Sequence, residues 1–65
     1  MKIITKDNFG RELFREKVIA ENVNEVIGEQ LVNKWNDKYW TEQSDFYLKL
    51  VEDDYILYDG YAELL

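Results

Sequence analysis

The stretch that decides the fold comprises residues 24–39, which read Asn24-Glu25-Val26-Ile27-Gly28-Glu29-Gln30-Leu31-Val32-Asn33-Lys34-Trp35-Asn36-Asp37-Lys38-Tyr39. Large apolar side chains recur in it at every fourth position, with a valine beside them: Ile27, Leu31, Trp35, Tyr39 and Val32. Such a row predicts one amphipathic helix that buries an apolar stripe against a core. Gly28 costs a helix interior about 1 kcal/mol relative to alanine, which indicates that another backbone packs close to it.

Both ends of this helix carry their own signals. Asn24 can accept a backbone N–H at the start; Asn22 is the alternative, with Glu25 three residues later as in a capping box. Lys34 and Lys38 suit the negative end of the helix dipole. The helix is therefore expected to begin near Asn24 and to end near the second lysine.

Short segments typical of strands flank the helix. Residues 2–5 form a short segment rich in β-branched side chains, and the turn formers Asp7-Asn8-Phe9-Gly10 follow them. Residues 46–51 are typical of a strand, in which successive side chains point to opposite faces, and this places Phe46, Leu48 and Leu50 on one face. The acidic residues 52–54 separate that segment from residues 55–58, which we expect to return beside it as a second hairpin.

Residues 11–21 leave two interpretations open. The run from Arg11 to Lys17 is rich in helix formers, whereas Phe14, Val18 and Ala20 also fall on one face of an extended strand. We favour a strand that ends near residue 23, because it would give residues 2–5 an antiparallel neighbour for their backbone hydrogen bonds.

The predicted fold is α+β, in the order β-β-α-β-β, with one amphipathic helix packed on one face of a small antiparallel sheet. No proline, repeat or low-complexity segment interrupts the chain, so we expect residues 1–65 to form a single domain. A core of this size is small, and such scaffolds often gain stability from a partner or a second copy.

Charge and composition exclude several classes of function. The chain has no cysteine and no histidine, and its net charge is −6. Eight of its 14 acidic residues lie after residue 32, which disfavours direct nucleic-acid binding and favours a protein partner with a basic surface. No apolar run approaches the length of a membrane span or a secretory signal, so we expect a cytoplasmic protein that does not bind membranes.

The residues that carry catalysis are scarce, and we expect no enzyme and no cofactor. Nucleophilic catalysis by Ser, Thr, Cys or Lys needs a neighbouring base, and the usual base, histidine, is absent. The Ser and Thr hydroxyls are Thr5, Thr41 and Ser44. The three glycines are too scattered for a phosphate-binding loop. Apolar residues between Asp54 and Asp59 break the alternation that a calcium loop needs, so no metal site is predicted.

The aromatic residues indicate where a protein-binding surface could lie. Eight of the ten lie between residues 35 and 61, together with seven acidic residues. A small core cannot use all these rings, and Tyr and Trp are enriched in interface hot spots. The predicted protein-binding residues combine these rings with the neighbouring carboxylates: Trp40, Tyr47, Glu52, Asp53, Asp54, Tyr55, Tyr58, Asp59 and Tyr61.

Two segments carry a resemblance: Val18-Ile19-Ala20-Glu21-Asn22-Val23-Asn24, continuing into the helix to Asn36, and Tyr47-x-Leu-x-Leu-Val-Glu-Asp-Asp-Tyr55-x-Leu-Tyr58. This pattern resembles small uncharacterised acidic accessory proteins of phages and prophages of Gram-positive bacteria. The resemblance covers about two thirds of the chain and has no catalytic signature. It implies a protein made during infection that binds and inhibits or redirects a host protein in the host cytoplasm, and it assigns no functional residue.

The leading functional hypothesis is therefore a non-catalytic acidic protein-binding module, in one form a phage-derived modulator or inhibitor of a host protein. A second hypothesis is a structural homo-oligomer or virion-associated protein that assembles through a sheet edge or through Leu64-Leu65. A third is a DNA mimic, in which carboxylates replace phosphates in the groove of a DNA-binding protein.

Overall fold

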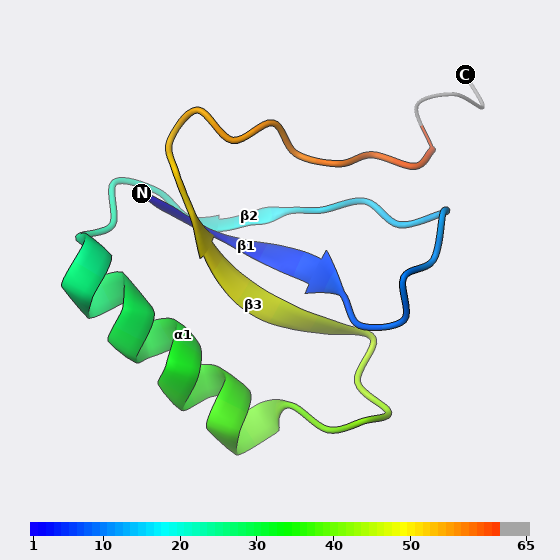
Figure 1. Ribbon diagram of the computed structural model, residues 1–65, viewed down its shortest axis with the longest axis horizontal. Coiled ribbons are helices and arrows are strands. Elements are labelled where there is room, and N and C mark those ends of the chain that lie inside the picture. Colours follow the sequence, from blue (N-terminus) through cyan, green and yellow to red (C-terminus); the bar gives the residue numbers. More distant parts are fainter. Residues whose placement is uncertain (62–65) are drawn as a thin grey trace.

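The computed structural model describes residues 1–61, and the Leu64-Leu65 tail lies outside this range. Four elements follow one another along the chain: β1 (Lys2–Asp7), β2 (Val18–Ala20), α1 (Glu25–Tyr39) and β3 (Phe46–Val51) (Figure 1). The α+β class is confirmed. The order β-β-α-β-β is not, because the described chain contains three strands and no strand at residues 55–58.

The three strands form one antiparallel sheet in the order β2-β1-β3. In the pairing of β1 with β3, Ile3 lies opposite Leu50 and Thr5 opposite Leu48, so these four side chains share one face of the sheet. The pairing of β1 with β2 shifts register between Ile3 and Ile4. The central strand β1 thus has hydrogen-bonded neighbours on both sides.

Residues 11–21 contain the short strand β2 and no helix. The strand interpretation is correct for Val18–Ala20, but the strand does not reach residue 23. The preceding turn is as expected: Gly10 has φ +65°, and the Asp7 carboxylate accepts the backbone N–H groups of Phe9 and Arg11.

Helix α1 begins at the predicted cap. The Asn24 side chain accepts the N–H groups of Val26 and Ile27 at 2.9 and 3.2 Å, whereas Asn22 lies in the turn before it with φ +55°. Gly28 is buried as its position suggests, although side chains rather than backbone approach it. A Cβ built there would lie 2.7 Å from Leu50 Cδ1 and 2.8 Å from a Val23 methyl group.

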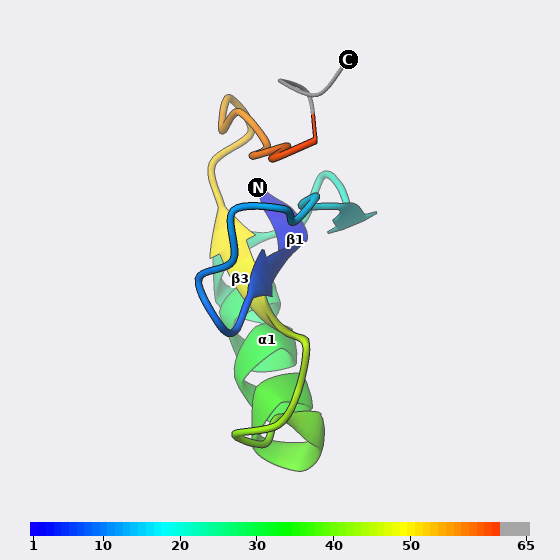
Figure 2. The same cartoon turned by 90° about the vertical axis from the view of Figure 1, so that its right-hand side faces the viewer.

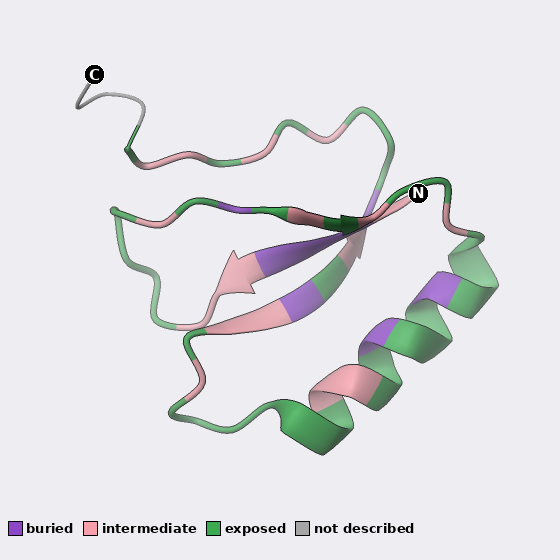
Figure 3. Cartoon of the chain, turned by 180° about the vertical axis from the view of Figure 1, so that it is seen from behind, coloured by how far each residue is buried: buried purple, intermediate pink, exposed green. Residues whose placement is uncertain are grey.

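The buried side of α1 differs from the expected stripe. Gly28 and Val32 are the buried residues of the helix, whereas Ile27, Leu31 and Tyr39 are more than half exposed. A four-residue repeat exceeds the 3.6 residues of a helical turn, so the row drifts by about 40° at each step. Only Trp35 in this row packs onto the sheet, and Figure 3 shows that most of the helix surface is exposed.

Helix α1 packs on one face of the sheet beneath β3 and β1, and the chain after β3 lies on the other face (Figures 1 and 2). The Cα atoms extend 37 × 29 × 13 Å. Within the described residues the helix contacts β3 and part of β1 but not β2. Among the three strands, β2 is therefore the one that the helix leaves uncovered.

The chain after β3 covers the opposite face of the sheet. Ile4, on that face, is fully buried, and Lys6 two residues along contacts both Glu16 and Tyr55. Residues 58–60 run antiparallel to residues 14–16, where the Glu16 N–H donates to the Tyr58 carbonyl and the Gly60 N–H to the Phe14 carbonyl, each at 2.9 Å. The last described segment thus pairs with the 14–16 loop.

The expected hairpin of residues 55–58 with β3 is wrong for a physical reason. One edge of β3 pairs with β1, and the other edge lies against α1, where the Asn36 side chain bonds the backbone of Leu48. Asn36 thus occupies the backbone groups of Leu48 in the middle of this edge, and the returning chain finds its backbone partners at residues 14–16 instead.

Candidate functional site

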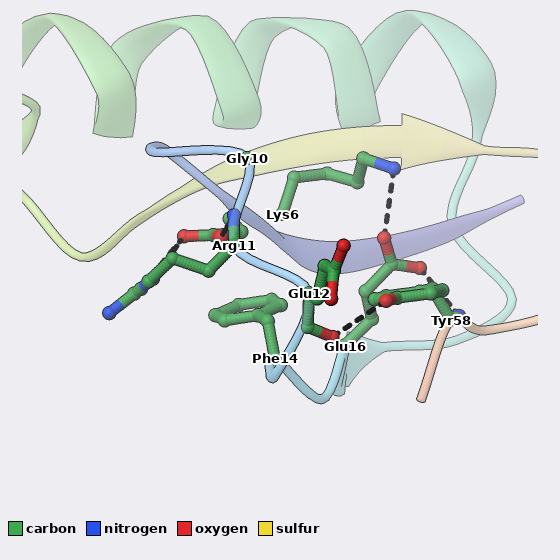
Figure 4. Close-up of a pocket in the computed structure, with 8 residues that line it drawn as sticks. Lys6, Gly10, Arg11, Glu12, Phe14, Glu16 and Tyr58 are labelled. Carbon is green, nitrogen blue, oxygen red and sulfur yellow. Dashed lines mark hydrogen bonds and ion pairs between the residues drawn. The ribbon is translucent and has the colours of Figure 1, made fainter. Parts of the chain in front are cut away.

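The covered face holds a polar cluster around Glu16, whose side chain is 3 % exposed. Its carboxylate accepts three donors: Lys6 Nζ at 2.8 Å, the Tyr55 hydroxyl at 2.8 Å and the Tyr58 N–H at 2.9 Å. A pocket lies at this cluster, and its lining includes Lys6, Glu16 and Tyr58. Figure 4 shows Lys6 and Glu16 pointing toward each other there. A buried carboxylate with three donors is held in its ionised form.

The titration behaviour of this cluster follows from the same contacts. Burial alone would raise the pKa of Glu16, but the hydrogen bonds from Lys6, Tyr58 and Tyr55 outweigh it and lower that pKa. The hydrogen bond to Glu16, opposed by burial, raises the pKa of Lys6 to about 12. Both groups therefore stay charged near neutral pH, and their contacts tie β1, the 14–16 loop and residues 55–58 together.

A second ion pair joins the two sides of the turn that follows β1. The Arg11 guanidinium binds the Asp7 carboxylate at 2.7 Å and lowers the pKa of that carboxyl to about 2. Every buried side-chain nitrogen and oxygen in residues 1–61 has a hydrogen-bond partner. The polar side chains of this pocket therefore satisfy one another, which is typical of a structural role.

The face of the sheet on which the helix packs carries apolar side chains instead of a polar cluster. We define the open face by the apolar side chains that lie there with at most partial cover: Ile19, Ile27, Leu31, Trp35, Tyr39 and Phe46. Ile19 is 57 % exposed, Ile27 56 %, Leu31 53 % and Tyr39 53 %. Beneath them lie the buried core residues Ile3, Val32 and Leu48. The apolar residues that border the core are therefore only partly covered on this side.

Two hollows mark the open face. One, of about 230 Å³, lies along the helix and is lined by Leu31, Lys34, Trp35, Lys38 and Tyr39. The other, of about 280 Å³, lies over the sheet and is lined by Thr5, Phe14, Arg15, Lys17, Ile19 and Phe46. The rings of Trp35 and Phe46 stack at 5.8 Å with 19° between their planes, which joins the two hollows into one surface.

The structure divides the nine predicted binding residues among three places. Trp40 and Tyr47 lie near the Phe46 end of β3, where the Trp40 indole N–H donates to Asn8 Oδ1 at 3.0 Å. The acidic turn of residues 52–54 is exposed at the other end of β3, about 17 Å away for a strand of this length. There Asp53 forms an ion pair with the N-terminal amine at 3.0 Å.

The remaining four lie together along the 14–16 loop. Tyr55 is half-buried in the Glu16 cluster, and the Tyr58 hydroxyl donates to the Glu12 carbonyl at 2.6 Å. Asp59 pairs with Arg15 at 3.1 Å, and the same guanidinium lies 5.4 Å from the Tyr61 ring centroid. The structure therefore uses several of these polar groups in contacts within the chain, while the rings of Trp40, Tyr58 and Tyr61 stay exposed.

Sequence reasoning missed the open face. Ile27 and Leu31 were expected in the core, and Ile19 was only part of a candidate strand. The signal that could have found them is the exact four-residue spacing of the helix row, because its drift takes the first members away from the side that packs on Val23 and Leu50.

Comparisons of the chain with protein-family models, with curated proteins and with solved structures return no match. Among the described residues, no helix has the length and apolar character needed to cross a membrane. No group of three or more acidic side chains within residues 1–61 is close enough to hold a metal ion.

Proposed function

We propose that this chain is a non-catalytic protein-binding module that makes contact through the open face. The observation that carries the proposal is the incomplete cover of the core: Trp35 and Phe46 are stacked over it yet only partly buried. Contiguous exposed apolar surface of this kind marks interaction sites in soluble proteins. Two aromatic rings at its centre are typical anchors of an interface.

The polar side of the molecule supports the same proposal. The carboxylate with the strongest contacts, Glu16, is saturated with donors, so the buried charge stabilises the fold. A phage-encoded modulator or inhibitor of a host protein is one form that such a module takes. That part of the proposal rests on the resemblance alone.

A matched pair of helix variants tests the proposal. Ile27 lies on the open face, and its neighbour Val26 is 63 % exposed and lies about 160° around the helix from the buried Gly28. Both residues are β-branched and exposed, so changing either to serine should have a small and similar effect on folding. The two variants differ mainly in the face that loses an apolar side chain.

The experiment is affinity capture from a lysate of Gram-positive bacteria with three baits: wild type, Ile27→Ser and Val26→Ser. We expect wild type and Val26→Ser to recover the same protein and Ile27→Ser to recover much less of it. Equal recovery by all three baits would contradict the open face as the contact surface. A further bait, Trp40→Ala, then tests the aromatic residues near the end of β3.

A further inference from the structure

The charged residues that line the two hollows of the open face are all basic. Lys34 and Lys38 line the hollow along the helix, and Arg15 and Lys17 line the hollow over the sheet. No carboxylate lines either hollow, although the chain has 14 acidic and eight basic residues. The open face therefore has a local charge opposite to the net charge of −6.

Most of these cations are available to a partner. Within residues 1–61, Lys17, Lys34 and Lys38 take part in no ion pair, and the Lys38 ammonium lies 5.3 Å from the Tyr39 ring centroid. Arg15 is partly engaged by Asp59. Glu29 lies about 140° around the helix from Lys34, so this carboxylate is on a different flank from the lysine; Asp37 lies about 60° from Lys34 but does not line the hollow.

From this arrangement we infer that the open face binds an amphipathic protein segment whose apolar side chains are flanked by carboxylates. The apolar side chains enter the two hollows on either side of the Trp35–Phe46 stack, and the carboxylates meet the lysines at the rim. Complementary charge of this kind raises the association rate and selects the partner. The inference deepens the proposed function and rests on it.

Two other occupants fit the observations less well. A second copy bound face to face brings two basic rims together, and like charges across an interface are unfavourable. An anionic membrane attracts the lysines but repels a protein of net charge −6, and it offers no side chains for separate hollows. A protein segment satisfies both the apolar and the charged part of the face.

Selection of short random peptides displayed on yeast against the full chain tests the inference. The selected peptides are then measured against wild type, Lys34→Glu, Lys17→Glu and the control Lys49→Glu. Lys49 is exposed between Leu48 and Leu50 in β3, so it faces the opposite side of the sheet. The control therefore carries the same change of charge away from the open face.

We expect the selected peptides to combine apolar residues with Asp or Glu. Lys34→Glu and Lys17→Glu should each weaken binding roughly 3- to 10-fold at low salt, and Lys49→Glu should have little effect. Peptides without carboxylates, or equal effects of Lys34→Glu and Lys49→Glu, would overturn the inference.

The Ile27→Ser variant separates the inference from the proposed function. If Ile27→Ser abolishes peptide binding but Lys34→Glu does not change it, the inference fails and the proposed function stands. If no selected peptide depends on Ile27, both fail. Two further results overturn the inference: sedimentation with phosphatidylglycerol vesicles that Lys34→Glu abolishes, and a dimer that Ile27→Ser disperses and Val26→Ser does not.

Discussion

The side-chain amide of Asn36 binds both backbone groups of Leu48. Its Nδ2 donates to the Leu48 carbonyl at 2.9 Å, and its Oδ1 accepts the Leu48 N–H at 3.0 Å. One helix residue thus satisfies two backbone groups at the middle of the outer edge of β3, which a neighbouring strand would otherwise bind. An exposed strand edge invites pairing with another chain, so this contact both docks the helix and protects the sheet.

Removal of this contact is the first prediction. Asn36→Ala leaves the Leu48 N–H and C=O without their partners in a half-buried position, which should lower the free energy of unfolding by about 1–3 kcal/mol. Urea unfolding followed by tryptophan fluorescence measures the change. Asn33→Ala is the matched control on the exposed side of the same helix and should change stability by less than about 0.5 kcal/mol. Similar losses in both variants would contradict the role of Asn36.

The second prediction concerns the side of α1 that packs. Leu31 is the larger residue, but it is 53 % exposed, whereas its neighbour Val32 is 7 % exposed. Val32→Ala should therefore lower the free energy of unfolding by about 1–3 kcal/mol, and Leu31→Ala by less than about 1 kcal/mol. Thermal unfolding of the two variants decides the point. A larger loss for Leu31→Ala would mean that the row Ile27-Leu31-Trp35-Tyr39 is the packed side after all.

The third prediction is the pH dependence that the carboxylates impose. The pKa of Glu16 is lowered in the folded state, and that of Asp7 is lowered to about 2. The unfolded chain therefore binds more protons in acid, so stability is full above the unfolded values near pH 4–5 and falls as the pH drops toward the folded values. Urea unfolding at several pH values between 7 and 2 measures this loss.

Glu16→Gln isolates the contribution of the buried carboxylate. It should lower the free energy of unfolding at pH 7 by about 1–3 kcal/mol, because the Lys6 ammonium loses its ionised partner. It should also reduce the acid branch, which is the fall of the unfolding free energy as the pH drops below about 5. Glu12→Gln, at an exposed position in the same loop, should leave the acid branch unchanged. An acid branch with the same slope in wild type and Glu16→Gln would show that Glu16 does not carry this dependence.

The fourth prediction tests how residues 58–60 are held. A Cβ at Gly60 would lie 1.7 Å from the Glu12 carbonyl oxygen, and that backbone atom cannot move as a flexible side chain can. Gly60→Ala should therefore detach the segment locally and speed hydrogen exchange at the Glu16 N–H, which donates to Tyr58. The N–H groups shared by β1 and β3 should stay protected.

Gly10→Ala supplies the comparison for that experiment. Open space surrounds Gly10, so its substitution meets only the strain of φ +65°, about 1 kcal/mol, and should not change exchange at Glu16 selectively. Unchanged protection of Glu16 in Gly60→Ala would mean that the loop contact is not needed to hold the segment.

Local signals predicted a large part of the fold. The Asn24 cap, the turn with Gly10 at positive φ and the strand at residues 46–51 all depend on residues close in sequence, and all three are found in the structure. The sequence also predicted that some aromatic rings would stay exposed, because a core of this size cannot bury all ten. These features follow from backbone geometry and composition, which act before any long-range contact forms.

The sequence by itself determined one capped helix, an antiparallel sheet and more apolar surface than a chain of this size can bury. Only the tertiary structure decided where that surface lies. The Asn36 contact holds α1 along the edge of β3, so residues 55–58 cannot pair there and the row that begins at Ile27 turns outward. The physical reason is competition for one strand edge: local pattern fixes what each segment can form, but which segment takes that edge depends on contacts between residues far apart in the chain.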